Sequence, residues 1–389
     1  MTTGFHIRCQ RAELVQALAA ADAVVPSTSA KPILTNLLLV AHADSLEIAA
    51  TDLQVGLRSI LSHIEVITSG QVVVPARKLV SVLKESRSAS VELTIEEQAD
   101  TVQLTIELSD GSYRLPTVIG EVFPQVTAYP GEGTVVQMSA DVFSQMIRKT
   151  IFAVDKERTS AVLSGVYLAV SSESILLAAT DGKVLSEFEH QQGTFVTEDN
   201  VLHTIVPAST MSHLQRVVDA GGSGAVEIAL VGKLIFVRMH ISDENGSGDH
   251  IAVELTSRCI EGSYPPYRNA LPAKSAQTMT FQQEELSSAV RRTALMTSSA
   301  SPGIVLSVSR GQAELSNLFN TSGTAKIPLH CSYDGEPQRF GFNASYIANV
   351  LKALSNNEVI FELNGAGRGI ITRDGESVFL VMPISLPNS

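Results

Sequence analysis

The stretch SLEIAATDL at residues 45–53 returns as SILLAATDG at residues 174–182, so that the shared AATD recurs after 129 residues. A third stretch of the same kind, QAELSNLF, occupies residues 312–319. All three alternate apolar and polar residues, a pattern typical of half-buried antiparallel strands joined by hairpins. The recurrence predicts one structural unit used three times along the 389 residues of the chain.

Two helices are expected in each unit, because each unit contains two segments with apolar residues four positions apart. The first helices are predicted at QRAELVQALAAA (10–21), ADVFSQMIRKT (140–150) and QEELSSAVRRT (283–293). The second helices, each introduced by a proline or asparagine start signal, are predicted at PARKLVSVLKESR (75–87), PASTMSHLQRVVD (207–219) and NASYIANVLKALS (343–355).

The predicted fold class is α+β, with three tandem similar domains at residues 1–131, 132–274 and 275–389. A chain of this length exceeds one ordinary hydrophobic core. Domain boundaries are expected at AYPGEGT (128–134) and LPAKSAQ (271–277), which are rich in proline, glycine and small residues. Hairpin loops inside the second domain are expected at GGSG (221–224) and NGSGD (245–249).

The N-terminal sequence MTTGFHIRCQRAEL lacks the features of a signal peptide, and no apolar run is long enough to span a bilayer. A cytoplasmic protein is therefore expected. The cysteines Cys9, Cys259 and Cys331 are far apart and odd in number, which predicts neither a disulfide framework nor a zinc site. No cofactor and no metal are expected.

The net charge of −12 argues, as an average, against binding to nucleic acid, but the charge is unevenly distributed. The six helical segments contain eleven basic and six acidic residues, so that the helices carry a net charge of +5 and the rest of the chain −17. The eleven basic residues of the helices are Arg11, Arg77, Lys78, Lys84, Arg87, Arg148, Lys149, Arg216, Arg291, Arg292 and Lys352. One interpretation is that helix surfaces simply favour lysine and arginine. The other is that the helices present a positive layer to a polyanion, while the acidic remainder discourages non-specific contacts.

The kind of polyanion is narrowed by what the sequence lacks. The chain has no tryptophan and no interleaved aromatic residues for stacking on single strands. Nothing in it resembles a helix-turn-helix or a zinc finger that reads bases. Sequence-independent contact with the backbone of duplex DNA is the nucleic-acid function that remains.

An enzyme is the rival class of function. The GAGRG segment (365–369) lacks the spacing of a nucleotide loop, and the pair Ser81 and Lys84 lacks the partner motifs of a serine hydrolase. The nine histidines form no metal-binding pair. Asp52 and Asp181 recur at equivalent places in the repeat, which favours a structural turn over catalysis. No catalytic residue is predicted.

Nine segments, in order and in register, together resemble the bacterial β clamp family, the β subunit of DNA polymerase III. They are KPILTNLLL (31–39), LEIAATDL (46–53), VVVPARKLVSVLK (72–84), FAV (152–154), AATDGKVL (178–185), TIVPAS (204–209), GSYPPYRNALP (262–272), FNASYIANVLKAL (342–354) and VFLVMPISL (378–386). The resemblance runs essentially from end to end.

The resemblance implies a head-to-tail homodimeric ring, with helices lining the hole and sheets outside. Such a ring encircles duplex DNA without sequence preference, is loaded by an ATP-dependent clamp loader, and tethers polymerase III and other DNA enzymes through short peptides. Twelve helices packed ~10 Å apart enclose a hole of roughly 28 Å, whereas six leave only about 9 Å. Duplex DNA needs about 20 Å, so one subunit is too small and two suffice.

The resemblance also implies three sets of site residues. The partner-peptide pocket maps to Leu163, Thr180, Gly182, Lys183, Val184, Leu185, Pro265, Ala270, Asn343, Tyr346, Leu380, Met382, Pro383 and Ile384. The residues expected to face DNA are Lys31, Arg77, Lys78, Arg148, Lys149, Arg216, Arg291, Arg292 and Lys352. The subunit interface maps to Lys78, Val82 and Tyr113 of the first domain, against Leu295 and Met296 of the third.

The chain departs from the family pattern at several places. The family usually has TDGHRL where this chain has Lys183 and Val184, and often has a basic residue where this chain has Ser385. The chain continues past the usual end with residues 387–389, and it has Pro207-Ala208-Ser209-Thr210 in place of a common VP-Arg-Lys stretch. Two alternatives to a main replicative clamp stay open: a second clamp copy, and a scaffold that does not hold DNA.

Overall fold

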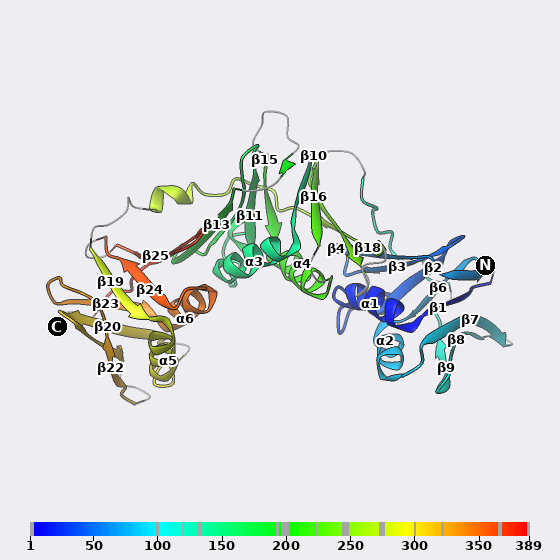
Figure 1. Cartoon of the computed structure of the whole chain (residues 1–389), viewed down its shortest axis with the longest axis horizontal. Helices are drawn as coiled ribbons and strands as arrows, with labels where there is room; N and C mark the ends of the chain where they lie inside the picture. Colours follow the sequence, from blue (N-terminus) through cyan, green and yellow to red (C-terminus); the bar gives the residue numbers. More distant parts are fainter. Residues whose placement is uncertain are drawn as a thin grey trace.

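The protein is a crescent in which all the labelled helices line the concave side and the strands form the convex side (Figure 1). This arrangement comes from a computed structural model that describes residues 4–98, 101–118, 120–130, 134–191, 194–195, 202–221, 224–242, 249–271, 277–298, 301–319, 323–364 and 368–386. Parts of both predicted boundaries, of both predicted hairpin loops and of the GAGRG segment lie outside these residues, as does the extension 387–389.

The six α-helices of the described residues fall where the apolar spacing predicts them. They are α1 (Arg11–Asp22), α2 (Ala76–Glu85), α3 (Ala140–Thr150), α4 (Ala208–Gly221), α5 (Gln283–Ala294) and α6 (Ala344–Ala353). The asparagine start signal of α6 works as a cap, because the Asn343 side chain accepts a hydrogen bond from the Ser345 amide at 2.9 Å.

The strands of the described residues form four antiparallel sheets. A five-stranded sheet has the order β5 (Glu65–Thr68), β1 (His6–Gln10), β7 (Ser90–Gln98), β8 (Thr101–Leu108) and β9 (Gly111–Pro116). A nine-stranded sheet has the order β14 (Thr194–Phe195), β10 (Thr134–Ser139), β16 (Ala225–Val231), β17 (Leu234–Ser242), β18 (Asp249–Arg258), β4 (Val55–Ser62), β3 (Ser45–Thr51), β2 (Asn36–Ala41) and β6 (Gly70–Pro75). An eight-stranded sheet has the order β15 (Leu202–Pro207), β11 (Gly165–Val170), β12 (Ile175–Thr180), β13 (Val184–His190), β26 (Ser377–Val381), β25 (Ile370–Asp374), β24 (Glu358–Glu362) and β19 (Thr278–Gln282). A four-stranded sheet has the order β22 (Lys326–His330), β21 (Gln312–Asn317), β20 (Gly303–Ser309) and β23 (Gln338–Asn343).

The three repeated sequence stretches occupy equivalent strands. SLEIAATDL supplies β3, SILLAATDG supplies β12 and QAELSNLF supplies β21. Each is the middle strand of a three-stranded run, β2-β3-β4, β11-β12-β13 or β20-β21-β22. The prediction of one unit used three times is confirmed.

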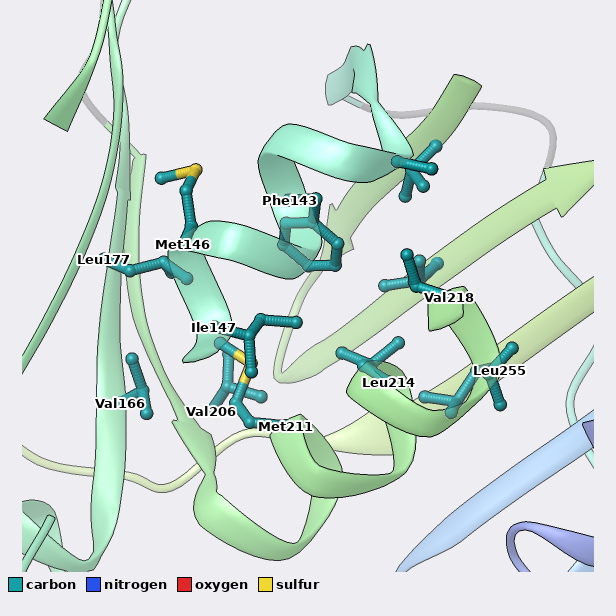
Figure 2. Close-up of a cluster of buried hydrophobic side chains, with 14 of the residues drawn as sticks. Phe143, Met146, Ile147, Val166, Leu177, Val206, Met211, Leu214, Val218 and Leu255 are labelled. Carbon is teal, nitrogen blue, oxygen red and sulfur yellow. The ribbon is translucent and has the colours of Figure 1, made fainter. Parts of the chain in front are cut away.

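The hydrophobic core lies between each helix pair and the sheets behind it. In the second domain, apolar residues of α3 and α4 face one another and the sheets (Figure 2), and the drawn cluster includes Phe143, Met146, Ile147, Val166, Leu177, Val206, Met211, Leu214, Val218 and Leu255. Phe143 and Leu214 are each 1% exposed. Burying one such side chain stabilises the fold by roughly 1.5–3 kcal/mol, so this packing fixes the helices on the concave side.

Two sheets cross from one domain to the next. Strand β18 of the second domain pairs with β4 of the first, and β13 of the second pairs with β26 of the third. A salt bridge reinforces each junction: Arg58 on β4 donates to Glu254 on β18 at 2.8 Å, and Lys149 on α3 donates to Asp374 at the end of β25 at 2.7 Å. Strand pairing therefore joins the three domains into one curved body.

The ion pair between Lys149 and Asp374 is buried, with side-chain exposures of 7% and 4%. Burial opposes ionisation of Asp374, but the ammonium of Lys149 and the Ser355 amide outweigh it and lower the pKa of this carboxyl. A lowered folded-state pKa stabilises the fold above the unfolded value of 3.8 and ceases to do so as pH falls through the folded value.

We expect Lys149→Met to lower the free energy of unfolding by about 3–5 kcal/mol at pH 7, because it leaves a buried carboxylate without its partner. The difference from the parent should shrink below pH 3.8, where Asp374 becomes protonated as the pH falls through its lowered pKa. Urea denaturation at several pH values measures both effects, with exposed Lys183→Met as the control. Equal stability of Lys149→Met and parent at pH 7 would contradict the assignment.

Candidate DNA-facing groove, peptide pocket and subunit interface

A groove of about 740 Å³ lies on the concave side where α3, α4 and α6 meet. It is bordered by three exposed basic residues, Arg148 of α3, Arg216 of α4 and Lys352 of α6. Neutral polar side chains complete the border: Gln145, Ser212, Gln215 and Asn349. These four residues were not predicted, because uncharged residues leave no trace in a charge count. Ser212 donates to the Ala208 carbonyl and Gln215 to Ser144 and Asp219, whereas Gln145 and Asn349 suit hydrogen bonding to phosphate oxygens.

Five other basic residues of the predicted DNA-facing set do not border this groove. Arg77 and Lys78 are exposed on α2, and Arg291 and Arg292 are exposed on α5, toward the two ends of the crescent (Figure 1). Lys31 is exposed in the loop before a 3-10 turn, outside the helix layer.

The structure corrects the prediction that Lys149 faces DNA. Its backbone is on the concave helix α3, but its ammonium turns away from solvent to Asp374 at 2.7 Å and lies 5.8 Å from the ring centre of Phe188. Arg11 is also engaged internally, because its guanidinium donates to the carbonyls of Ser88 and Leu83 at 2.6 and 3.0 Å. A helix carries each residue to a face, but tertiary contacts within and between domains decide whether a cation stays free.

The predicted peptide pocket is built around the turn between β12 and β13. The Thr180 hydroxyl donates to the Val184 carbonyl at 2.7 Å, and the Asp181 carboxylate accepts from the amides of Lys183 and Val184 at 2.8 Å. Gly182 has a φ of 84°, a left-handed conformation that glycine adopts at little cost. The turn leaves Gly182 and Lys183 exposed.

The turn between β3 and β4 has the same hydrogen bonds. The Thr51 hydroxyl donates to the Val55 carbonyl at 2.8 Å, and Asp52 accepts from the Gln54 and Val55 amides at 2.9 and 2.7 Å. The prediction that Asp52 and Asp181 shape turns is therefore confirmed. Leu53, with φ 75°, occupies the place of Gly182, a conformation that costs an L-residue with a side chain roughly 1–2 kcal/mol.

Segments of the second and third domains converge on the β12–β13 turn. The Met382 amide donates to the Lys183 carbonyl and the Ile384 amide to the Gly341 carbonyl, both at 2.8 Å. Tyr346 of α6 donates its hydroxyl to Asp181 at 2.7 Å; burial, then the Asp181 carboxylate, raises the pKa of this tyrosine. Met382 is 37% exposed and Leu163, Pro265, Pro383 and Ile384 are half-buried, while Ala270 is exposed.

Three aliphatic residues of the predicted pocket are buried. Leu185 and Leu380 are 3% and 4% exposed and pack with Ile371 beneath Tyr267 and Leu271, so they form a floor. Val184 is a correction: strand alternation turns it to the opposite face of β13, where it is 2% exposed in the core shared with the helices. The structure thus places Met382 and Tyr346 at the β12–β13 turn and turns Val184 away into the core.

The predicted interface residues lie at opposite ends of the crescent. Tyr113 on β9 is 43% exposed, and Lys78 and Val82 lie on the neighbouring α2. Leu295, just after α5, is 74% exposed, and Met296 beside it is half-buried. They cannot meet within one chain, as Figure 1 makes plain.

No group of three or more histidine, cysteine, aspartate or glutamate side chains suited to a metal ion occurs in the described part of the chain. Burial raises the pKa of the Cys9 thiol to about 12, so this cysteine is a neutral core residue. Among the described helices, none is long and apolar enough to cross a membrane.

Family models cover nearly the whole chain. The N-terminal, central and C-terminal domain models of the DNA polymerase III beta subunit match residues 5–127, 137–266 and 268–385. The beta sliding clamp of Synechococcus elongatus is 28% identical over 390 residues, covering 97% of this chain and 98% of that protein. The beta sliding clamp of Caulobacter vibrioides is 26% identical over 358 residues, covering 90% and 91%.

Solved structures agree with the family models. The DNA polymerase III subunit beta of Pseudomonas aeruginosa superposes with a TM-score of 0.84 at 25% identity, covering 98% of this chain and all of that one. The Caulobacter crescentus beta sliding clamp also gives a TM-score of 0.84 at 25% identity, covering 99% of this chain and all of that one. The chain therefore belongs to the DNA polymerase III beta subunit family, the sliding clamps, which are processivity subunits without an active site of their own.

Proposed function

We propose that two copies of this chain close head to tail into a ring around duplex DNA, and that the pocket between the second and third domains holds polymerase III and other DNA enzymes to it. An ATP-dependent clamp loader opens the ring, and the protein acts in the cytoplasm. The domains run through residues 1–131, 132–274 and 275–389, in keeping with the three family-model matches.

Ring closure follows from the internal repeat. Strands β4 and β13 hold equivalent places and pair with β18 and β26, which are equivalent to each other. In the repeat, β22 is the third strand equivalent to β4 and β13, and β9 is the third strand equivalent to β18 and β26. Strands β22 and β9 lie at opposite ends of the crescent, and within the described residues each has a neighbour on one side only. Pairing β9 of one copy with β22 of another repeats the same junction and leaves no open edge there.

The observation that carries the DNA-binding proposal is the basic groove on the concave side. Arg148, Arg216 and Lys352 come from three helices and two domains, yet they border one groove in an otherwise acidic protein. A ring of two crescents encloses a hole of roughly 28 Å by helix packing distances, which admits duplex DNA. Contacts from such side chains reach phosphates and carry no base preference.

The pocket suits an extended peptide with apolar anchors. Leu185 and Leu380 form a closed floor, Met382 and Ile384 line its open side, and the Lys183 ammonium adds one cation at the rim. Of the departures from the family pattern, Lys183 and Ser385 are exposed and can touch a bound peptide, whereas Val184 faces the core. Client preference is therefore set by Lys183 and Ser385.

We expect Arg148→Glu/Arg216→Glu/Lys352→Glu to shorten retention on nicked circular DNA after loading, and to reduce the slope of log affinity against log salt by about 5, because the ring of two copies loses six phosphate contacts. Gel filtration of labelled clamp with the plasmid measures retention, and cutting the plasmid should release the parent. Arg310→Glu/Arg339→Glu/Arg368→Glu, three exposed arginines, is the charge-matched control. Equal retention of the two triple variants would contradict the proposal that this groove binds DNA.

We expect Leu295→Asp/Met296→Asp to give monomers, because a carboxylate at a buried interface loses its hydration. Light scattering should show 41.5 kDa for the variant and twice that for the parent. Ile360→Asp, which changes an apolar residue that is 48% exposed, should stay dimeric. An intact Leu295→Asp/Met296→Asp dimer would show that the interface lies elsewhere.

We expect Met382→Ala to weaken binding of a fluorescein-labelled extended peptide with leucine and phenylalanine anchors by about tenfold, since it removes an apolar wall of the pocket. Fluorescence anisotropy measures the dissociation constant. Ile360→Ala, at an exposed residue on the sheet surface, should bind like the parent. A Met382→Ala variant with parental affinity would place the peptide at another surface.

A further inference from the structure

A second groove, of about 790 Å³, lies at the junction of the first and second domains. Its border includes Leu53 and Gln54 from the β3–β4 turn, Pro207 and Ala208 at the start of α4, and Ile260 after β18. None of its lining residues belongs to the pocket between the second and third domains.

The two grooves occupy equivalent places in the repeat. The β3–β4 turn and the β12–β13 turn share their hydrogen bonds, as described above. The Ile260 amide donates to the Ile205 carbonyl at 2.8 Å, just as the Ile384 amide donates to the Gly341 carbonyl. The internal repeat has therefore built the same turn and the same backbone contact at both junctions, with different side chains around them.

The lining of the second groove contains three basic residues and one acidic residue, Asp155. Lys156, Arg158 and Arg258 border the groove, all three are exposed, and none has an ion-pair partner within the described residues. The loop that carries Lys156 and Arg158 is held in place by Asp155, whose carboxylate accepts from the Glu157 and Ser160 amides at 3.1 Å and from the Thr159 hydroxyl. Three free cations on an ordered frame favour an anionic occupant.

Leu53 is the exposed apolar residue of the groove's lining, whereas the other apolar residues there are buried or half-buried. This leucine is 53% exposed and holds a φ of 75°, where the equivalent turn has Gly182. A bulky residue kept in a strained, exposed position is more often found at a binding site than elsewhere. Sequence-independent contact with duplex DNA is made to backbone phosphates and leaves Leu53 uncovered, whereas a peptide offers both acidic and aliphatic side chains.

We propose that the groove between the first and second domains is a second docking site, which binds an extended segment of a partner protein carrying acidic side chains beside an aliphatic one. Lys156, Arg158 and Arg258 pair with the carboxylates, and Leu53 with Ile260 contacts the aliphatic side chain. The site is independent of the pocket around Met382, so one subunit holds two segments at once.

Fluorescence anisotropy with a labelled nine-residue peptide of alternating aspartate and leucine tests the proposal. The parent binds it, and Lys156→Glu/Arg158→Glu/Arg258→Glu weakens binding by about tenfold or more. Leu53→Gly also weakens binding, while its melting temperature is at least that of the parent, because glycine adopts the turn without strain. All variants are compared in a Met382→Ala background, which weakens the other pocket; there Arg310→Glu/Arg339→Glu/Arg368→Glu and Lys183→Glu keep the affinity of that background.

Four outcomes would overturn the proposal: no binding by the parent up to about 1 mM peptide, parental affinity in the first triple variant, parental affinity in Leu53→Gly, or a loss that follows Lys183→Glu instead. A fifth outcome is that Lys156→Glu/Arg158→Glu/Arg258→Glu loses affinity for a 20-base-pair duplex but not for the peptide. That result would make the groove a binding site for DNA phosphates. Loader-dependent retention of Leu53→Gly on nicked circular DNA reports the clamp function separately and should equal that of the parent.

Discussion

Antiparallel strand pairing across the domain junctions is the constraint on which the rest of the structure depends. The pairing of β18 with β4 and of β13 with β26 fixes each domain against the next through backbone hydrogen bonds, whatever the side chains. Because each junction makes one sheet out of two half-sheets, the curvature of the crescent is set by backbone geometry. The helices then have one side left to occupy, the concave one (Figure 1).

The positions of the charged side chains follow from that architecture. A helix on the concave side presents its polar face to the hole, so that Arg148, Arg216 and Lys352 gather although they are far apart in sequence. The same closeness of neighbouring domains removes Lys149 from the surface, because Asp374 of the third domain lies within reach of its ammonium. Neighbouring cations on α3 thus have different surroundings, since Arg148 is exposed and Lys149 is buried as a link between domains.

The repeat also explains why grooves occur at both junctions within the chain. A turn with a threonine and an aspartate approaches the start of a helix and the segment that follows an edge strand of the neighbouring half-sheet. Evolution of side chains has given the two grooves different chemistry, with an aliphatic floor and one lysine in one of them, and three basic residues around a leucine in the other. A backbone frame repeated within the chain can therefore carry two different linings.

The sequence by itself determined the helices, the repeated strand motif and the α+β class, because hydrophobic periodicity is a local property. Equivalent positions in the repeat sufficed to identify Asp52 and Asp181 as turn residues. The sequence could not show that Val184 faces the core and Leu185 the pocket floor. The alternation of side chains along a strand assigns them to two opposite faces, but it does not show which residues cover each face. Nor could the sequence show that Lys149 is buried or that Lys156, Arg158 and Arg258 surround one groove. Those facts depend on contacts between residues distant in sequence, and only the tertiary structure brings such residues together.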